Sequence, residues 1–76
     1  MYCVILGAGV VGSHMAEILS SKGHRLTVVD RDRRALRRLE NKVDFHAVPG
    51  VSFRKDILEA AGADEAELVL CVTDND

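Results

Sequence analysis

Apolar positions along this chain follow two periods that alternate from the N-terminus to the C-terminus. Four short runs are apolar almost throughout, and the three segments between them carry apolar residues at helical spacing. The pattern predicts strands at residues 2–6, 25–29, 43–48 and 68–72, and helices at residues 10–22, 32–41 and 54–61. Strands that alternate with helices in this way indicate an α/β fold with a parallel sheet covered by helices.

The apolar stripe of each predicted helix is expected to face the sheet. The stripes consist of Val11, Met15, Ile18 and Leu19 in the first helix, Ala35, Leu36 and Leu39 in the second, and Ile57, Leu58 and Ala61 in the third. Gly23 and Gly62 are expected to end the first and third helices, as glycine commonly does. Pro49 is expected to end the third strand, because proline cannot donate a hydrogen bond to a central ladder.

Right-handed crossovers between these elements predict the strand order 3-2-1-4 of a doubly wound, Rossmann-type sheet. The order reverses between the first and fourth strands, so a ligand crevice is expected above the turn after strand one and the loop after strand four. Residues 1–76 are interpreted as one nucleotide-binding domain. Because no helix follows the fourth strand, we expect the chain to be the N-terminal part of a longer domain.

The first predicted strand runs into a Gly-x-Gly-x-x-Gly turn at the start of the first helix. The turn consists of Gly7, Ala8, Gly9, Val10, Val11 and Gly12. In nucleotide-binding turns of this kind, one glycine permits the sharp turn, one lets a pyrophosphate approach the backbone, and one allows close helix packing. The unpaired N–H groups and the positive dipole end of the helix favour an anion at the same place.

Asp30 ends the second predicted strand, 18 residues after Gly12. This spacing is close to the roughly 20 residues that separate the turn from a ribose-binding carboxylate. An aspartate at the end of a strand can instead cap the following helix. Asp32 is better placed for that cap, so we interpret Asp30 as the ligand of an adenosine ribose.

Composition excludes several other classes of function. The chain has 76 residues, of which 47% are hydrophobic, and its net charge of −2 gives no general attraction to nucleic acid or anionic membrane. No apolar run approaches the roughly 18 residues of a membrane span. Cys3 and Cys71 are expected to be buried in strands. The scattered histidines make neither a metal site nor a catalytic triad, so we predict no metal and no catalytic residue.

Five arginines cluster around the second predicted helix: Arg31, Arg33, Arg34, Arg37 and Arg38. Such a cluster could bind the 2′-phosphate of NADP, or it could form a solvated helix face. The carboxylate of Asp30 would repel a 2′-phosphate, which favours the solvated face and an unphosphorylated ribose.

Four segments together resemble the N-terminal domain of the Trk potassium-uptake regulators, known as the RCK or KTN domain. The segments are residues 5–12 (ILGAGVVG), 29–32 (VDRD), 60–69 (AAGADEAELV) and 72–76 (VTDND). The resemblance spans the whole chain. It implies that the glycine turn holds the phosphates of NAD(H), ATP or ADP and that Asp30 holds the ribose. It further implies that Arg31 flanks the adenosine and that Thr73 and Asp74 border the cofactor.

One segment departs from the family pattern. After the third strand the family usually has glycine, a polar residue, a small residue, and serine or threonine, whereas this chain has Gly50, Val51, Ser52 and Phe53. Val51 lies at the cofactor site by this resemblance, but it cannot make the polar contact on the adenine side. Phe53 could offer a stacking surface or belong to the core.

The resemblance implies a cytoplasmic regulator, without enzyme activity, that controls a potassium channel or transporter in the inner membrane. It implies a homo-oligomer that reaches the membrane through that partner. The absence of a cation at Val10 and Val11 favours NAD(H) or ADP over ATP. The alternatives are the cofactor-binding half of an NAD-dependent oxidoreductase and an adenine-nucleotide sensor without a channel partner.

Overall fold

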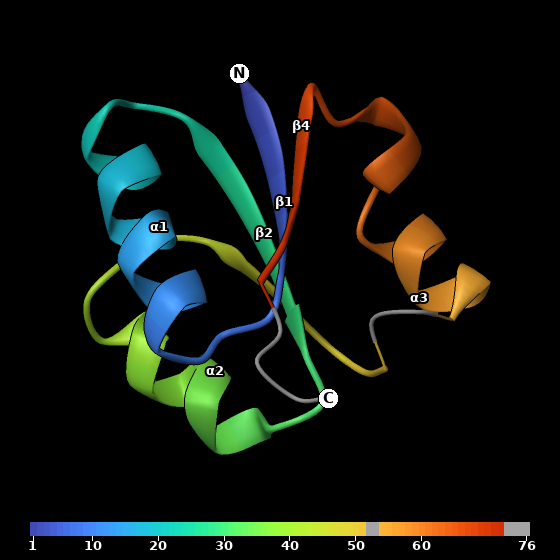
Figure 1. Cartoon of the computed structure of the whole chain (residues 1–76), viewed down its shortest axis with the longest axis horizontal. Helices are drawn as coiled ribbons and strands as arrows, with labels where there is room; N and C mark the ends of the chain where they lie inside the picture. Colours follow the sequence, from blue (N-terminus) through green and yellow to red (C-terminus); the bar gives the residue numbers. More distant parts are fainter. Residues whose placement is uncertain (52–53, 73–76) are drawn as a thin grey trace.

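The computed structural model describes residues 1–51 and 54–72. The elements along the chain are β1 (Tyr2–Leu6), α1 (Val10–Ser21), β2 (Arg25–Asp30), α2 (Arg33–Glu40), β3 (His46–Pro49), α3 (Lys55–Ala60), the short 3-10 helix η1 (Ala63–Glu65) and β4 (Leu68–Cys71). The strands form one parallel sheet in the order β3-β2-β1-β4. Helices α1 and α2 lie on one side of this sheet, and α3 and η1 lie on the other (Figure 1). The predicted doubly wound, Rossmann-type architecture is therefore confirmed.

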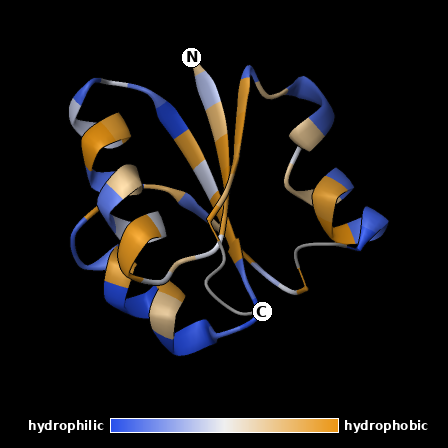
Figure 2. Ribbon diagram, in the orientation of Figure 1, coloured by the Kyte–Doolittle hydropathy of each residue, from blue (hydrophilic) through white to orange (hydrophobic). Residues whose placement is uncertain are grey.

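Strand β1 lies between β2 and β4 and separates two apolar cores. Cys3 and Ile5 belong to the core beneath α1 and α2, whereas Val4 and Leu6 belong to the core beneath α3. Successive side chains of a strand point to opposite faces, so an apolar residue at every position fits a strand with helices on both sides. In Figure 2 the central strands are accordingly apolar along much of their length.

The buried face of α1 differs from the predicted stripe. Gly12, Ala16 and Leu19 are buried, whereas Val11 is 57% exposed and Ile18 is 37% exposed. The helix is turned so that its smallest residues face the sheet, because its first turn lies too close to the glycine turn for a larger side chain. The prediction that the whole apolar stripe of α1 faces the sheet is therefore wrong.

Helix α2 follows the predicted pattern. The carboxylate of Asp32 accepts hydrogen bonds from the backbone N–H groups of Arg34 and Ala35, at 2.9 and 3.4 Å, and so caps the helix as expected. Ala35, Leu36 and Leu39 are buried in the core. The five arginines of this region are exposed.

Strand β3 starts later and ends later than predicted. The N–H groups of Lys42 and Val43 both donate to the carbonyl oxygen of Leu39, which prolongs the end of α2 and leaves Val43 buried outside the sheet. Pro49 is the last residue of β3 and pairs with Asp30. Proline is tolerated here because β3 is an edge strand of the sheet.

Cysteine burial was predicted correctly for one residue of two. Cys3 is fully buried, but Cys71 is exposed. Strand β4 lies at the sheet edge, and alternate residues such as Leu68 and Leu70 pack against the core of α1 and α2. Cys71 therefore shares the other face of β4 with Val69, which is also exposed.

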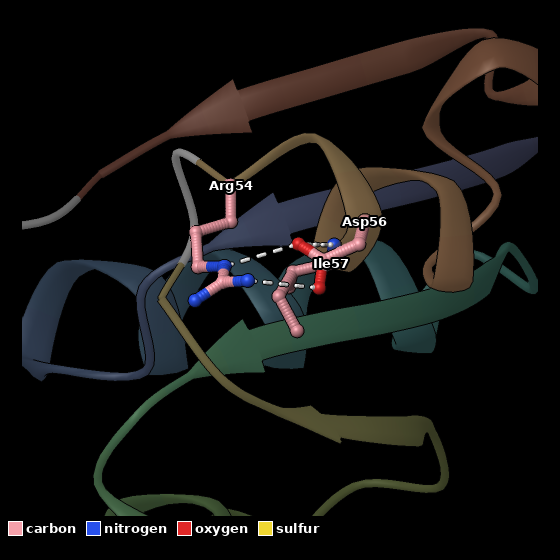
Figure 3. Close-up of polar contacts among 3 residues, drawn as sticks. All are labelled: Arg54, Asp56 and Ile57. Carbon is pink, nitrogen blue, oxygen red and sulfur yellow. Dashed lines mark hydrogen bonds and ion pairs between the residues drawn. The ribbon is translucent and has the colours of Figure 1, made fainter.

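Helix α3 begins and ends close to the predicted residues, and Gly62 follows it with a φ of +74°, as expected for a residue that ends a helix. Near its start, the exposed guanidinium of Arg54 donates to the carboxylate of Asp56, whose Oδ1 also accepts from the N–H of Ile57 (Figure 3). This hydrogen bond from Arg54 lowers the pKa of the Asp56 carboxyl below its ordinary value. An ion pair so exposed adds little to stability.

The hydroxyl of Tyr2 joins the sheet to the end of α3. It donates to the carbonyl oxygen of Ala61 and lies 2.6 Å from Oγ1 of Thr27, which is buried.

The short η1 helix that follows α3 was not predicted. Within the described residues, no helix is both long and apolar enough to cross a membrane.

We expect Tyr2→Phe to lower the free energy of unfolding by about 1–3 kcal/mol, because the Thr27 hydroxyl and the Ala61 carbonyl lose a buried partner. Phenylalanine keeps the aromatic ring over which the guanidinium carbon of Arg25 lies, 5.4 Å from the centroid. Urea unfolding of the two proteins measures the difference. An unchanged midpoint would show that this hydroxyl does not hold α3 to the sheet.

Candidate functional site

The carboxyl edge of the sheet brings the glycine turn together with the ends of β2, β3 and β4. The N–H of Gly7 donates to the carbonyl oxygen of Val29 at 2.8 Å, so the contact between β1 and β2 continues one residue into the turn. The N–H of Val72 donates to the carbonyl oxygen of Leu6 at 3.0 Å and so places the end of β4 on the other side. The predicted switch point between the first and fourth strands is therefore confirmed at this turn.

The three glycines of the turn are distinguished by their geometry. Gly7 has a φ of +123°, a conformation that residues with a side chain rarely adopt. A Cβ on Gly12 would lie 1.9 Å from the carbonyl oxygen of Gly7, so the helix could not pack where it does. Gly9 has a φ of −74° and a ψ of −159°, which any residue can adopt. The backbone conformation at Gly9 therefore does not explain why glycine occupies this position.

The N-terminal end of α1 offers backbone donors at the same turn. The first hydrogen bond of the helix runs from the N–H of Ser13 to the carbonyl oxygen of Gly9, at 2.8 Å. The N–H groups of the preceding helical residues have no partner within the helix. Among residues 1–51 and 54–72, no side chain caps this end; the first turn contains no acidic residue, and Val10 is 84% exposed. The arrangement suits an anion from solvent.

The carboxylate of Asp30 is held by two backbone hydrogen bonds. Oδ2 accepts from the N–H of Ala8 at 2.7 Å, and Oδ1 accepts from the N–H of Asp32 at 2.8 Å. The half-buried side chain thus joins the glycine turn to the segment before α2. A carboxylate has about four acceptor sites, so each oxygen keeps the capacity to accept a further hydrogen bond.

Two further predicted site residues lie near Asp30. The N–H of Gly50 donates to the carbonyl oxygen of Asp30 at 3.1 Å, which places Val51, 41% exposed, just beyond this contact. Arg31 follows Asp30 directly and is exposed. The predicted contributions of Thr73 and Asp74, and the alternatives for Phe53, fall outside the described residues.

Sequence reasoning missed two features of this edge. One is the role of the Ala8 and Asp32 N–H groups in orienting Asp30, for which the Asp-x-Asp spacing was an available signal. The other is Val72, whose side-chain methyl group would lie 3.1 Å from a Cβ at Gly12. No sequence pattern indicates that contact, because it joins residues far apart in the chain.

In the part of the chain that the structure describes, no group of three or more His, Cys, Asp or Glu side chains could hold a metal ion.

Comparison with known proteins shows similarity along the whole chain. The model of a family described as the TrkA-N domain matches residues 3–76. Proteins named "Trk system potassium uptake protein TrkA" from Vibrio alginolyticus and Streptomyces coelicolor are each 40% identical to this chain over 76 residues. The match covers all of this chain but only 17% of the first relative and 34% of the second.

A solved structure is also similar to this chain in both fold and sequence. The chain resembles the structure described as "Shewanella denitrificans Kef CTD in AMP bound form", with a TM-score of 0.73 and 31% sequence identity. The similarity covers 91% of this chain and 40% of that one.

We expect Gly12→Ala to destabilise the fold by more than about 4 kcal/mol, because the added Cβ meets backbone atoms that cannot move aside independently. Gly23→Ala is the matched control. Gly23 has a φ of +86° but nothing within 4 Å of an added Cβ, so only conformational strain of about 1–2 kcal/mol is expected. Thermal or urea unfolding compares the variants, and equal effects would contradict the packing argument.

Proposed function

The chain belongs to the TrkA-N domain family, and on this premise we propose that it is a regulatory domain that binds an adenine nucleotide and controls potassium transport through a membrane partner. The observation that carries the proposal is the glycine turn. Gly7 and Gly12 have structural reasons to be glycine, whereas the backbone conformation of Gly9 gives none. The close approach of a phosphate to the backbone at Gly9 supplies that reason.

The order of groups along the carboxyl edge matches a nucleotide. The phosphates would lie over the exposed N-terminal end of α1, and the two ribose hydroxyls would donate to the remaining acceptor sites of Asp30. Arg31 and Val51, both exposed and close to Asp30 along the chain or through Gly50, are proposed to border the adenosine beyond the ribose. Thr73 and Asp74 follow Val72 directly in sequence and are proposed to border the cofactor from the side of β4.

NAD(H) is the proposed ligand, with ADP or ATP as alternatives. All of them contain an adenosine with an unphosphorylated 2′-hydroxyl, as does the AMP named for the Kef structure. Val10 and Val11 give the turn no cation for a γ-phosphate, which favours NAD(H) or ADP over ATP. The arginines of α2 are exposed, and the carboxylate of Asp30, proposed to bind the ribose, would repel a 2′-phosphate, which argues against NADP.

The names of the relatives link the family to potassium uptake, and we propose the same process for this protein. The nucleotide would act by binding one conformation of the assembly more tightly than another, without hydride transfer. The intact protein would be a cytoplasmic homo-oligomer that reaches the membrane through a potassium channel or transporter.

We expect Gly9→Val to abolish nucleotide binding while the fold is retained, because valine can adopt the backbone conformation but fills the space next to the phosphates. Calorimetry with NADH and with AMP measures binding by the intact protein, and circular dichroism checks the fold. In cells that carry the transporter, the variant should also lose the response of potassium uptake to the nucleotide.

Equal affinities of the variant and the unmodified protein would refute nucleotide binding at this turn. Nucleotide binding with no effect on potassium flux would refute the regulatory part of the proposal alone. Substrate-dependent oxidation of NADH by the intact protein would instead identify an oxidoreductase.

We expect Asp30→Ala to weaken NAD(H) and ADP binding by about 1–3 kcal/mol, the usual cost of lost charge-assisted hydrogen bonds. Asp32→Ala is the matched control, because it removes the cap of α2 but leaves the ribose carboxylate in place. It should lower stability and preserve affinity. Tighter binding of NADP than of NAD by the unmodified protein would contradict the ribose assignment.

A further inference from the structure

A concave surface lies between α1 and α2, with a volume of about 700 Å³. We call it the interhelical groove. Ala8, Ala35 and Leu39, all buried residues, form its apolar part. The volume is within the range of roughly 300–1,000 Å³ that small-molecule sites occupy in proteins. A groove of this size with an apolar base can hold a small organic ligand.

The two helices contribute opposite charges to the interhelical groove. Arg38 in α2 and Lys42, two residues after the end of α2, lie on one side, and Glu17 and His14 of α1 lie on the other. Among the described residues, the ion pair found within 4 Å is that of Arg54 and Asp56, far along the chain. The carboxylate of Glu17 is therefore not paired with either cation across the groove, and both sides remain available to a ligand.

The electrostatic balance of the region favours an anionic ligand. Residues 31–42 contain six basic side chains and two acidic ones, in a chain whose net charge is −2. Arg37 and the other arginines of α2 are exposed and add to the positive potential next to Arg38 and Lys42. Two cations that line the same groove suit a ligand with two anionic groups, and Glu17 suits a hydroxyl donor on the same ligand.

The interhelical groove adjoins the proposed nucleotide site at the glycine turn, where the two share Ala8, Gly9 and Val10. Asp30 and Arg31 do not line the groove, and the charged residues that line it are not among those proposed to hold the nucleotide. The charged groups that would hold a ligand in the groove are therefore separate from those that would hold the nucleotide.

We propose that the interhelical groove binds a small hydroxy-dicarboxylate. Its carboxylates pair with Arg38 and Lys42, its hydroxyl donates to Glu17, and its short carbon chain lies on Leu39. The cations supply charge-assisted hydrogen bonds, and the hydroxyl contact discriminates against dicarboxylates that lack this donor.

Calorimetry of the intact protein with malate tests the proposal, with succinate as the matched ligand that lacks the hydroxyl. We expect saturable binding of malate and weaker binding of succinate. Arg38→Gln and Lys42→Gln should each weaken malate binding about tenfold or more. Arg37→Gln is the control variant, because it removes the same charge from the neighbouring position of α2, outside the groove.

The proposal is overturned if malate shows no saturable binding, or if succinate binds as tightly as malate. Equal losses from Arg37→Gln and Arg38→Gln would also overturn it, because they would indicate a diffuse attraction rather than a site.

Discussion

The contact between Gly12 and the carbonyl oxygen of Gly7 leaves no room for a side chain, and much of the structure depends on it. Because α1 begins so close to the turn that precedes it, the helix presents Ala16 and Leu19 to the sheet and leaves Val11 in solvent. The same approach directs the N–H groups of the first helical turn, which have no partner within the helix, to the carboxyl edge. Helix packing and the position of the helix end proposed to bind an anion are thus consequences of one steric constraint.

Asp30 adds a polar constraint to this steric one. Its carboxylate binds the N–H groups of Ala8 and Asp32, and its carbonyl oxygen accepts from Gly50, so a single residue joins three segments at the edge of the sheet. These hydrogen bonds orient the carboxylate, which reduces the ordering that binding would require. The residue proposed to hold the ribose is therefore also a structural residue of the domain, and its substitution reports on both roles.

Sequence patterns predicted the elements best where a local rule and a buried face coincide. In α2, the cap at Asp32 and the apolar spacing of Leu36 and Leu39 indicate the same helix, and the structure confirms both. The pattern failed at Cys71 and at the start of β3. Burial of a strand residue depends on which elements cover the strand, and the apolar Val43 is buried beside α2 instead of in the sheet. Burial beside α2 removes the apolar side chain of Val43 from water just as burial in the sheet would, because the hydrophobic effect has no preferred direction.

The amino-acid sequence by itself determined the alternation of strands and helices, the strand order and the glycine turn, because periodicity, capping and chain handedness act over short stretches. Only the tertiary structure decided the rotation of α1, the two hydrogen bonds that orient Asp30, and the groove that places Glu17 opposite Arg38. These features join residues distant in sequence. Their geometry follows from how whole elements pack, since close packing leaves each helix few orientations against the sheet.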